Sequence, residues 1–219
     1  MTKSDTKISG LLLLLTFVIA ITGAALSLSL HWMVDSSFMP WTNYISDLSV
    51  GPNGSSIIYV IMMLGMSFLL IPFFFFLTRE LKTHYNLQNP GYIALFFGLI
   101  TSVDIIIMVF FPLDITRPAI YNTHIITGVI LFFGMTGFLG TYGWIFNKLS
   151  DFPNILSLLA YGASMFSFIF AVLLAITELF DVLNQHAITY IIEWTAFIFF
   201  VVWLLLTSIH LNKLSKNNN

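Results

Sequence analysis

The sequence contains no cysteine and few charged residues. Without cysteine, the chain forms no disulfide, holds no thiolate metal site and carries no redox-active thiol. Lys, Arg, Asp and Glu make up only 8% of the residues, against about 25% in an average soluble domain. The chain also lacks a phosphate-binding loop, a GxSxG nucleophile elbow and a basic patch, and no polar stretch is long enough to fold alone in water. These absences argue against a soluble domain and against nucleic acid as a partner.

Apolar residues dominate what is present. They make up 58% of the chain, and the mean hydropathy is +0.93. A helix crosses the hydrocarbon core of a bilayer with about 20 apolar residues, at a rise of about 1.5 Å each. The sequence therefore predicts an all-α polytopic membrane protein, with residues 1–219 forming a single six-transmembrane-helix bundle. The expected helices span residues 9–30, 57–77, 91–112, 121–146, 154–176 and 188–210.

The first apolar segment has some features of a signal peptide. Lys3 and Lys7 precede it, and small residues follow it. Its apolar run continues to Leu30, however, which is longer than the core of about 7 to 15 residues in a signal peptide. We therefore expect residues 9–30 to be a retained membrane helix.

Basic residues fall almost entirely on one side of the expected helices. Of the 8 Lys and Arg residues, only Arg117, between the third and fourth helices, lies on the other side. Arg79 and Lys82 are expected in the loop between the second and third helices. The positive-inside rule then predicts that both termini are cytoplasmic and that the loop of residues 31–56 is extracytoplasmic. The residues on the cytoplasmic side are Lys3, Lys7, Arg79, Lys82, Lys148, Lys213 and Lys216.

Acidic residues show the opposite bias, because most of them belong to the outer loops or the outer halves of helices. One interpretation is that the positive-inside topology leaves acids on the outer face, where water solvates them. The other is that some of them line a site. The outer acids are Asp35, Asp47, Asp104, Asp114, Glu178, Asp181 and Glu193.

Two of these acids lie within expected membrane helices. Asp104 precedes Pro112 by eight residues, about 12 Å at about 1.5 Å per residue, and Glu193 has a comparable depth in the last helix. A carboxylate at the centre of a bilayer costs about 2.5 to 3.5 kcal/mol, so such groups face the bundle interior and are paired, protonated or hydrated. We expect Asp104 and Glu193 to share an outward-opening polar pocket beneath His124. The structural alternative is a hydrogen bond that holds the third and sixth helices together.

A further group of polar residues follows the third helix, in the segment FFPLDITRPAIYNTH. Asp114 and Arg117 occupy a short loop, and His124 lies near the start of the fourth helix. One interpretation is a structural clamp between Arg117 and nearby carboxylates. The other is a site for zinc or a similar divalent cation, because imidazole and carboxylate groups are suitable ligands, although the spacing matches no compact motif such as HExxH. The metal-site hypothesis uses His31, Asp47, Asp114 and His124.

The loop of residues 31–56 is the longest interruption between apolar segments. It contains Trp32, Phe38, Trp41 and Tyr44, together with proline and glycine residues. Aromatic side chains anchor at membrane interfaces, and proline and glycine favour turns. We therefore expect this loop to fold back over the bundle with Asp47 pointing inward.

Glycine is concentrated in the expected fourth helix, at positions 128, 134, 137, 140 and 143. Small residues let membrane helices approach one another closely. We expect this face to be a packing surface, and a substrate groove is the alternative.

Short motifs in the chain resemble those of a known membrane family. Residues 45–48 (ISDL), the segment 111–114 (FPLD) and His124 resemble the ISDLG-like, FPxD and His-led fourth-helix segments of an uncharacterised prokaryotic six-helix family, a domain of unknown function. Ser49 stands where glycine is usual. Residues 44–47 also resemble the PYISDTG loop of the DRAM/Sfk-like eukaryotic membrane proteins, although Leu48 and Ser49 depart from it. The resemblance implies a six-helix fold, and the eukaryotic relatives are associated with autophagy and phosphoinositide synthesis. It carries over no catalytic residue.

These observations favour a membrane protein with an outward-facing pocket of acids and histidines. We expect this pocket to bind a lipid headgroup, a cation or another small ligand, so that the protein acts as a sensor or scaffold with membrane lipids as partners. One alternative is a membrane hydrolase in which a divalent metal lowers the pKa of a bound water and a carboxylate acts as general base. Another is a transporter that relays protons or cations through intramembrane acids. The expected ligand-binding residues are Asp47, Asp104, Asp114, Arg117, His124 and Glu193.

Overall fold

The computed structural model describes residues 3–179 and 186–217, so Asp181 lies outside the described residues. All regular structure in these two ranges is helical, which confirms the predicted all-α fold. Six helices are long and apolar enough to cross a bilayer, and the chain is therefore an integral membrane protein built as a six-helix bundle. The elements are α1 (Lys3–Trp32), the 3₁₀-helix η1 (Ile45–Val50), α2 (Ser55–Tyr85), α3 (Gln88–Phe110), α4 (Pro118–Lys148), α5 (Asn154–Leu174), the π-helical turn η2 (Ala175–Leu179) and α6 (His186–Asn217).

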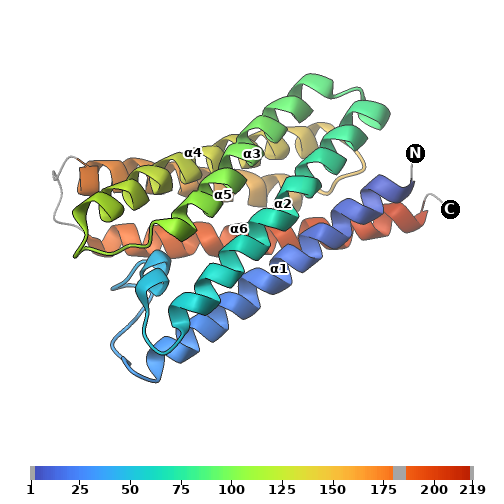
Figure 1. Cartoon of the computed structure of the whole chain (residues 1–219). Helices are drawn as coiled ribbons and strands as arrows, with labels where there is room; N and C mark the ends of the chain where they lie inside the picture. The colour runs from blue at the N-terminus through green and yellow to red at the C-terminus, as the bar shows by residue number, and fades with distance from the viewer. Residues whose placement is uncertain (1–2, 180–185, 218–219) are drawn as a thin grey trace.

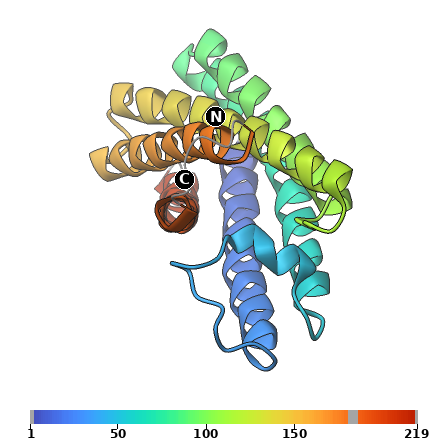
Figure 2. The same ribbon diagram turned by 90° about the vertical axis from the view of Figure 1, so that its left-hand side faces the viewer.

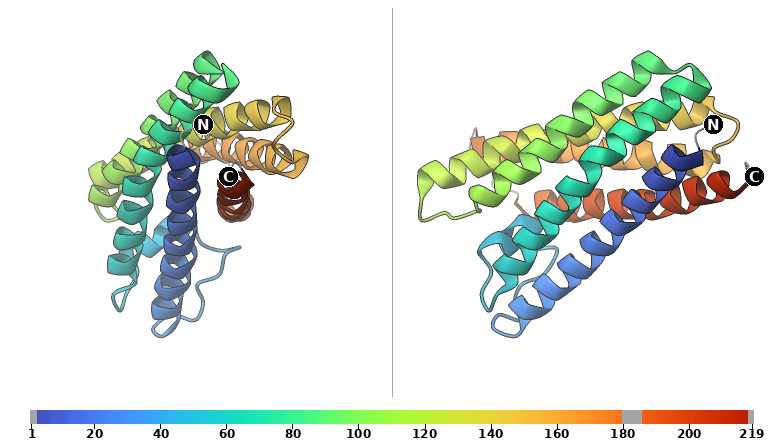
Figure 3. Two further views of the ribbon diagram at one scale, coloured as in Figure 1. Left: turned by 90° about the vertical axis from the view of Figure 1, so that its right-hand side faces the viewer. Right: turned by 45° about the vertical axis from the view of Figure 1, so that its right-hand side comes forward.

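The six long helices form a closed ring in chain order. Each helix packs against the next one, and α6 returns to pack against α1. Figure 1 shows both termini at one end of the ring, here named the terminal end, together with the turns after α2 and α4. The opposite end, here named the loop end, carries residues 33–54 and the connection between α3 and α4 (Figure 3). The two ends of the enclosed interior are therefore covered by different segments.

The predicted helices are present, but α1, α4 and α6 extend beyond their predicted ends, so that Lys7, Lys148 and Lys213, predicted to flank helices, lie inside them. α2 is also longer than predicted. It continues to Tyr85, so Arg79 and Lys82 lie inside α2 and the predicted loop position of these two residues is wrong. Leu81 is fully buried, and its packing extends the helix beyond the most apolar segment. The helix ends at Asn86, which has a φ of 53° and donates its backbone N–H to the Leu81 carbonyl. Asparagine tolerates this left-handed conformation, which commonly terminates helices.

Aromatic side chains fill the ring towards the terminal end. Phe138, Tyr142 and Trp203 are fully buried. The ring centroids of Tyr142 and Trp203 are 5.9 Å apart, and those of Phe146 and Phe152 are 4.4 Å apart. Aromatic pairs at such distances contribute about 0.5 to 1.5 kcal/mol each beyond the area that they bury. This close packing leaves the loop-end half of the ring as the place for an interior cavity.

The glycines of α4 let α3 and α5 approach it closely. A Cβ atom at Gly134 would lie 2.6 Å from the Thr101 Oγ1 atom of α3, and one at Gly143 would lie 2.9 Å from the Tyr161 ring of α5. Both distances are shorter than real Cβ contacts. The predicted packing surface on this helix is therefore confirmed.

Candidate functional site

The loop after α1 folds back over the loop end of the ring, as predicted. Phe38 and Leu48 are buried, and the Trp32 indole N–H donates a hydrogen bond to the Phe38 carbonyl at 2.7 Å. The short helix η1 packs against α1, α2 and α6. In Figure 2 it lies beside the loop-end halves of α1 and α2. Residues 38–50, which cover this end of the interior, are here named the lid.

Asp47 stabilises the first turn of the short helix in the lid. Its Oδ2 atom accepts the Tyr44 backbone N–H at 2.8 Å, an N-terminal capping contact. Burial raises the pKa of Asp47 to about 6. The hydrogen bonds from Tyr44 and Asn43 oppose this rise in pKa, and the neighbouring Glu178 carboxylate adds to it. Asp47 was predicted to bind a ligand. In this structure its carboxylate accepts a hydrogen bond from the backbone of the lid.

Polar side chains of the neighbouring helices fasten the lid. The Trp194 indole N–H of α6 donates to the Asn43 carbonyl at 3.0 Å. The Tyr44 hydroxyl donates to Glu178 Oε1 at 3.3 Å, and the Tyr121 hydroxyl of α4 donates to the other oxygen of the same carboxylate. Burial, followed by the Glu178 charge, raises the pKa of Tyr44 above its ordinary value. This phenol therefore remains a hydrogen-bond donor to Glu178.

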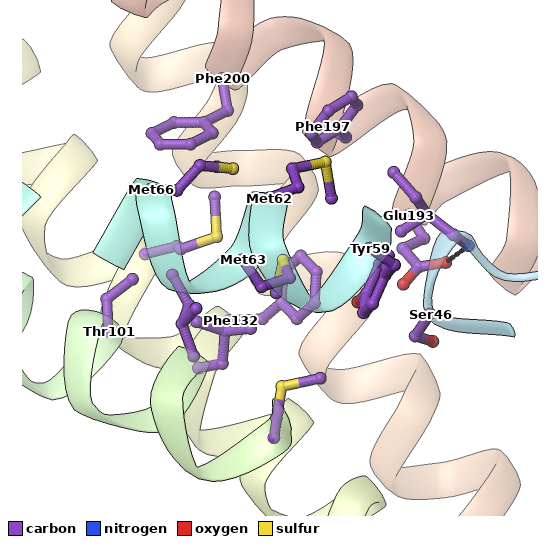
Figure 4. Close-up of a pocket in the computed structure, with 15 residues that line it drawn as sticks. Ser46, Tyr59, Met62, Met63, Met66, Thr101, Phe132, Glu193, Phe197 and Phe200 are labelled. Atoms are coloured by element: carbon purple, nitrogen blue, oxygen red, sulfur yellow. Dashed lines mark hydrogen bonds between the residues drawn. The ribbon is translucent and has the colours of Figure 1, made fainter. Parts of the chain in front are cut away.

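A cavity of about 70 Å³ lies directly beneath the lid, enclosed by α2, α3, α4 and α6 (Figure 4). Its wall is mostly apolar and unusually rich in methionine. Methionine side chains are unbranched and flexible, so they adapt to guests of irregular shape. The lining residues used below are Tyr59, Met62, Met63, Met66, Met108, Met135, Phe132, Phe197 and Glu193.

Glu193 is the acidic side chain in the wall of this cavity. It is only 3% exposed, and its Oε2 atom accepts the Ile45 backbone N–H of the lid at 2.7 Å. Figure 4 shows Glu193, Tyr59 and Ser46 gathered at the lid end of the cavity, with Phe200 at the far end. None of the ion pairs among the described residues includes Glu193. A buried carboxylate without a cationic neighbour thus faces an apolar chamber.

A smaller cavity of about 10 Å³ adjoins the first one. The two cavities share Ser46, Met108, Phe132 and Glu193 in their walls, and the smaller cavity also touches His124. His124 is 3% exposed. His124 and Glu193 therefore border the same small cavity, whereas the predicted pocket was polar and included Asp104.

Asp104 does not join this site. It is buried at 6% exposure, yet it lines neither of the two cavities, and no hydrogen bond or ion pair with another described residue reaches its carboxylate. The predicted sharing of one pocket by Asp104 and Glu193 is not observed. α3 and α6 both reach the first cavity, but α3 contributes Thr101, Ile105 and Met108 to its wall, and Asp104 is not among these residues.

Asp114, Arg117 and His124 contact groups within the connection between α3 and α4. The Arg117 Nε–H donates to Asp114 Oδ2 at 2.7 Å, and the Thr116 backbone N–H donates to Asp114 Oδ1 at 2.9 Å. The hydrogen bonds from Thr116, and then the contact with Arg117, hold the pKa of Asp114 below its ordinary value. The His124 Nδ1 atom lies 2.6 Å from the Phe111 carbonyl oxygen. This geometry matches the structural clamp predicted as one alternative.

The four residues of the metal-site hypothesis lie in separate arrangements. The His31 Nε2 atom is 4.0 Å from Asp35 Oδ2. Asp47 caps the lid helix, whereas Asp114 and His124 contact the connection between α3 and α4. Among the described residues, no three His, Cys, Asp or Glu side chains form a group that could hold a metal ion. The fold therefore does not bring His31, Asp47, Asp114 and His124 together as ligands.

Two groups of residues escaped the sequence predictions, and the first lies at the terminal end. The Thr6 hydroxyl donates to Glu80 Oε1 at 2.9 Å, and His84 Nε2 lies 3.6 Å from Glu80 Oε2. Arg79 Nε lies 3.0 Å from Asp5 Oδ2. These contacts join α1 to α2. The available signal was the four-residue spacing of Glu80 and His84, which puts both on one helix face.

The second missed group is the methionine-rich wall of the cavity. Tyr59, Met62, Met63 and Met66 follow the spacing i, i+3, i+4, i+7, which defines one face of a helix. That pattern is equally typical of an ordinary core-facing stripe. The cavity could not be predicted from this stripe, because its other walls belong to α3, α4 and α6.

Comparison of the chain with protein-family models gave no match, and comparisons with curated proteins and with solved structures gave no significant match. The family resemblance carried by residues 44–48, 111–114 and 124 therefore stays a prediction. The function has to be inferred from the geometry of the lid and the cavity.

Proposed function

We propose that this protein binds an amphiphilic, lipid-like ligand in the cavity beneath the lid and acts in the membrane as a sensor or scaffold. The observation that carries the proposal is Glu193, a buried carboxylate at the lid end of an otherwise apolar chamber. Ligand sites are typically apolar concavities with a few placed polar groups. An intramembrane acid is costly, and a bound polar headgroup would relieve that cost.

The wall of the cavity supports an apolar tail as the second part of the ligand. The volume of about 70 Å³ is several times the ~10 to 15 Å³ that one water molecule requires, but it is less than the ~150 Å³ of a cavity that binds benzene, so an alkyl chain enters only if side chains in the wall move. Met62, Met63 and Met66 offer a flexible surface that can enlarge around a chain. The hydrolase and transporter alternatives gain no comparable support, because both depend on groups of residues that lie apart in the fold.

We further propose that the lid faces the extracytoplasmic side and that both termini are cytoplasmic. The support is the distribution of basic residues, of which Arg117 alone belongs to the loop end. A ligand would then reach Glu193 from the outer leaflet or from the periphery of the lid.

The proposal is tested with a photoreactive long-chain alcohol and the purified protein in a nonionic detergent. Crosslinks are expected on the α2 and α4 peptides that line the cavity. Met66→Trp, which fills the cavity, is expected to reduce this labelling about tenfold or more, since about 1.4 kcal/mol of lost affinity corresponds to tenfold. Met63→Phe is the milder second variant if Met66→Trp does not fold.

Met165→Trp is the matched control, because this α5 methionine is 52% exposed on the outside of the ring. It is expected to leave the labelling of the cavity peptides unchanged. Equal labelling in all variants, or labelling confined to the outer faces of the helices, would show that the cavity is not a binding site.

A further inference from the structure

We infer that the headgroup bound in this cavity is a cation of the alkylammonium class, held between the Glu193 carboxylate and the neighbouring aromatic rings. The inference rests on the proposed function and specifies its ligand. Three features carry it: the charge of the loop end, the unused hydrogen-bonding capacity at the lid end of the cavity, and the aromatic wall.

The charge of the loop end is strongly one-sided. Asp47 of the lid lies close enough to Glu193 for the two carboxyl groups to interact, and Glu178 in turn lies close to Asp47. Arg117 is the basic residue of this end, and it is engaged by Asp114 at 2.7 Å. No Lys or Arg side chain in the described ranges forms an ion pair with Asp47 or Glu193. An anionic headgroup would be repelled here, and a cationic one would be attracted.

Hydrogen-bonding groups at the lid end of the cavity are only partly used. Glu193 Oε2 accepts the Ile45 N–H at 2.7 Å, and the Ser46 backbone and side chain also hydrogen-bond this carboxylate, which has about four acceptor positions in all. Tyr59 lies beside Glu193 in Figure 4, and its hydroxyl forms no hydrogen bond with a described residue although Tyr59 is only 4% exposed. An ammonium group brings three N–H donors, so it can satisfy both the carboxylate and the phenol oxygen.

The rings around this end suit a positive charge. Tyr59, Phe132 and Phe197 all line the cavity. The face of an aromatic ring attracts a cation, and desolvated contacts of this kind are worth about 2 kcal/mol or more. The methionines beyond these rings would contact the alkyl chain. A neutral alcohol of the same length would keep the chain contacts and lose the charge-dependent ones.

The test compares three competitors of equal chain length: dodecylamine, dodecanol and dodecanoate. Each is titrated, as a mole fraction of the detergent micelle, against the photoreactive alcohol in the cavity of the purified protein. For the natural sequence, dodecylamine is expected to compete about tenfold or more better than dodecanol, and dodecanoate worse than both, because charge-assisted contacts are the strong ones. Glu193→Gln is expected to remove the preference for the amine while dodecanol competes as before.

Asp35→Asn is the matched control, since it removes the same charge from the loop end at a residue outside the cavity wall. It is expected to keep the preference for the amine. Tyr59→Phe keeps the ring and removes the hydroxyl, and it is expected to reduce the preference without abolishing it. If Glu193→Gln does not fold, the three competitors on the natural sequence still decide the question, and Glu193→Asp, which keeps the charge on a shorter side chain, is expected to weaken the preference for the amine without abolishing it.

The outcomes separate the two proposals. Labelling of the cavity with equal competition by amine and alcohol would overturn the cationic headgroup and leave the proposed function standing. A preference for the amine that survives in Glu193→Gln would also overturn it, because the carboxylate would not be its source. Absence of cavity labelling by the alcohol probe itself would overturn the proposed function.

Discussion

Two carboxylates of the loop end have different roles because they face different groups. Glu193 lines the cavity, with one oxygen taken by the Ile45 N–H. Asp47 accepts the Tyr44 N–H and so belongs to the lid. The sequence singled out both residues as candidates, because an acidic side chain in or beside a membrane helix costs free energy and usually has a structural or functional role. It did not separate their roles, since these depend on backbone N–H groups that are placed only when the lid folds back.

Asp47 makes closure of the lid dependent on pH. Its pKa of about 6 in the closed lid is above the ordinary value of 3.8, so the closed lid holds a proton that an open lid releases. The stabilisation from this proton is complete below about pH 4 and is lost as the pH rises through about 6. The lid is therefore expected to open more often at about pH 8 than at about pH 5. Other titratable groups near Asp47 are Glu178, Glu193, Tyr59, Tyr121 and Tyr190.

Hydrogen-exchange protection factors for the backbone amides of η1 measure this equilibrium. Asp47→Asn retains a hydrogen-bond acceptor at the cap and is expected to flatten the pH dependence between about pH 5 and pH 8, because Asn does not titrate. If the variant kept the same pH dependence as the natural sequence, the titrating group would be one of the other acids of the loop end.

At the scale of the helices, the sequence predicted which segments cross the membrane but not where each helix ends. Apolar length identified all six, since a helix pairs its own backbone groups and the hydropathy of its side chains then decides whether it inserts into lipid. The end of α2 was missed because Leu81 is held by tertiary packing, which no local pattern reveals. The packing face of α4 was predicted because glycine has a single dominant effect in membrane helices, which is to let neighbours approach.

Gly134→Val is expected to destabilise the contact between α3 and α4. A Cβ atom there would meet Thr101 Oγ1 at 2.6 Å, and overpacking of this kind costs about 1 to 3 kcal/mol. Gly128→Ala is the control, because its Cβ would meet only the end of the flexible Leu174 side chain at 3.3 Å. Thermal unfolding of the purified protein should show a clear loss for Gly134→Val and a small change for Gly128→Ala. Equal stability of the two would mean that α3 moves away from α4 at little cost.

At the scale of the whole molecule, the closed ring decides which predicted residues meet. Glu193 lines the cavity, whereas Asp104 does not, although Ile105 and Met108 of the same helix as Asp104 do. The arrangement of helices around a ring is a tertiary property. A single sequence therefore indicates how deep a residue lies along the membrane normal, but it does not indicate which residues of other helices that residue meets. The same limit hid the cavity, which four helices and the lid build together.

The proposed orientation is tested by cysteine labelling, for which this cysteine-free chain is well suited. Ser37→Cys at the loop end is expected to react with a membrane-impermeant maleimide in intact cells, because the side of the membrane with few basic residues faces outward. Ser150→Cys, in the exposed turn after α4, is expected to react only after the cells are opened. The reverse pattern would place the lid in the cytoplasm.

Hydrogen bonds between Glu193 and the lid join the cavity to the segment that covers it. The Glu193 carboxylate that lines the cavity also accepts the Ile45 N–H of the lid at 2.7 Å. A guest that engages this carboxylate must therefore alter its hold on the lid, and by thermodynamic reciprocity a protein that grips the lid must alter the affinity for the guest by the same factor. Binding of a ligand in the cavity would then be detected at the aqueous side through the lid, and no membrane helix would need to move.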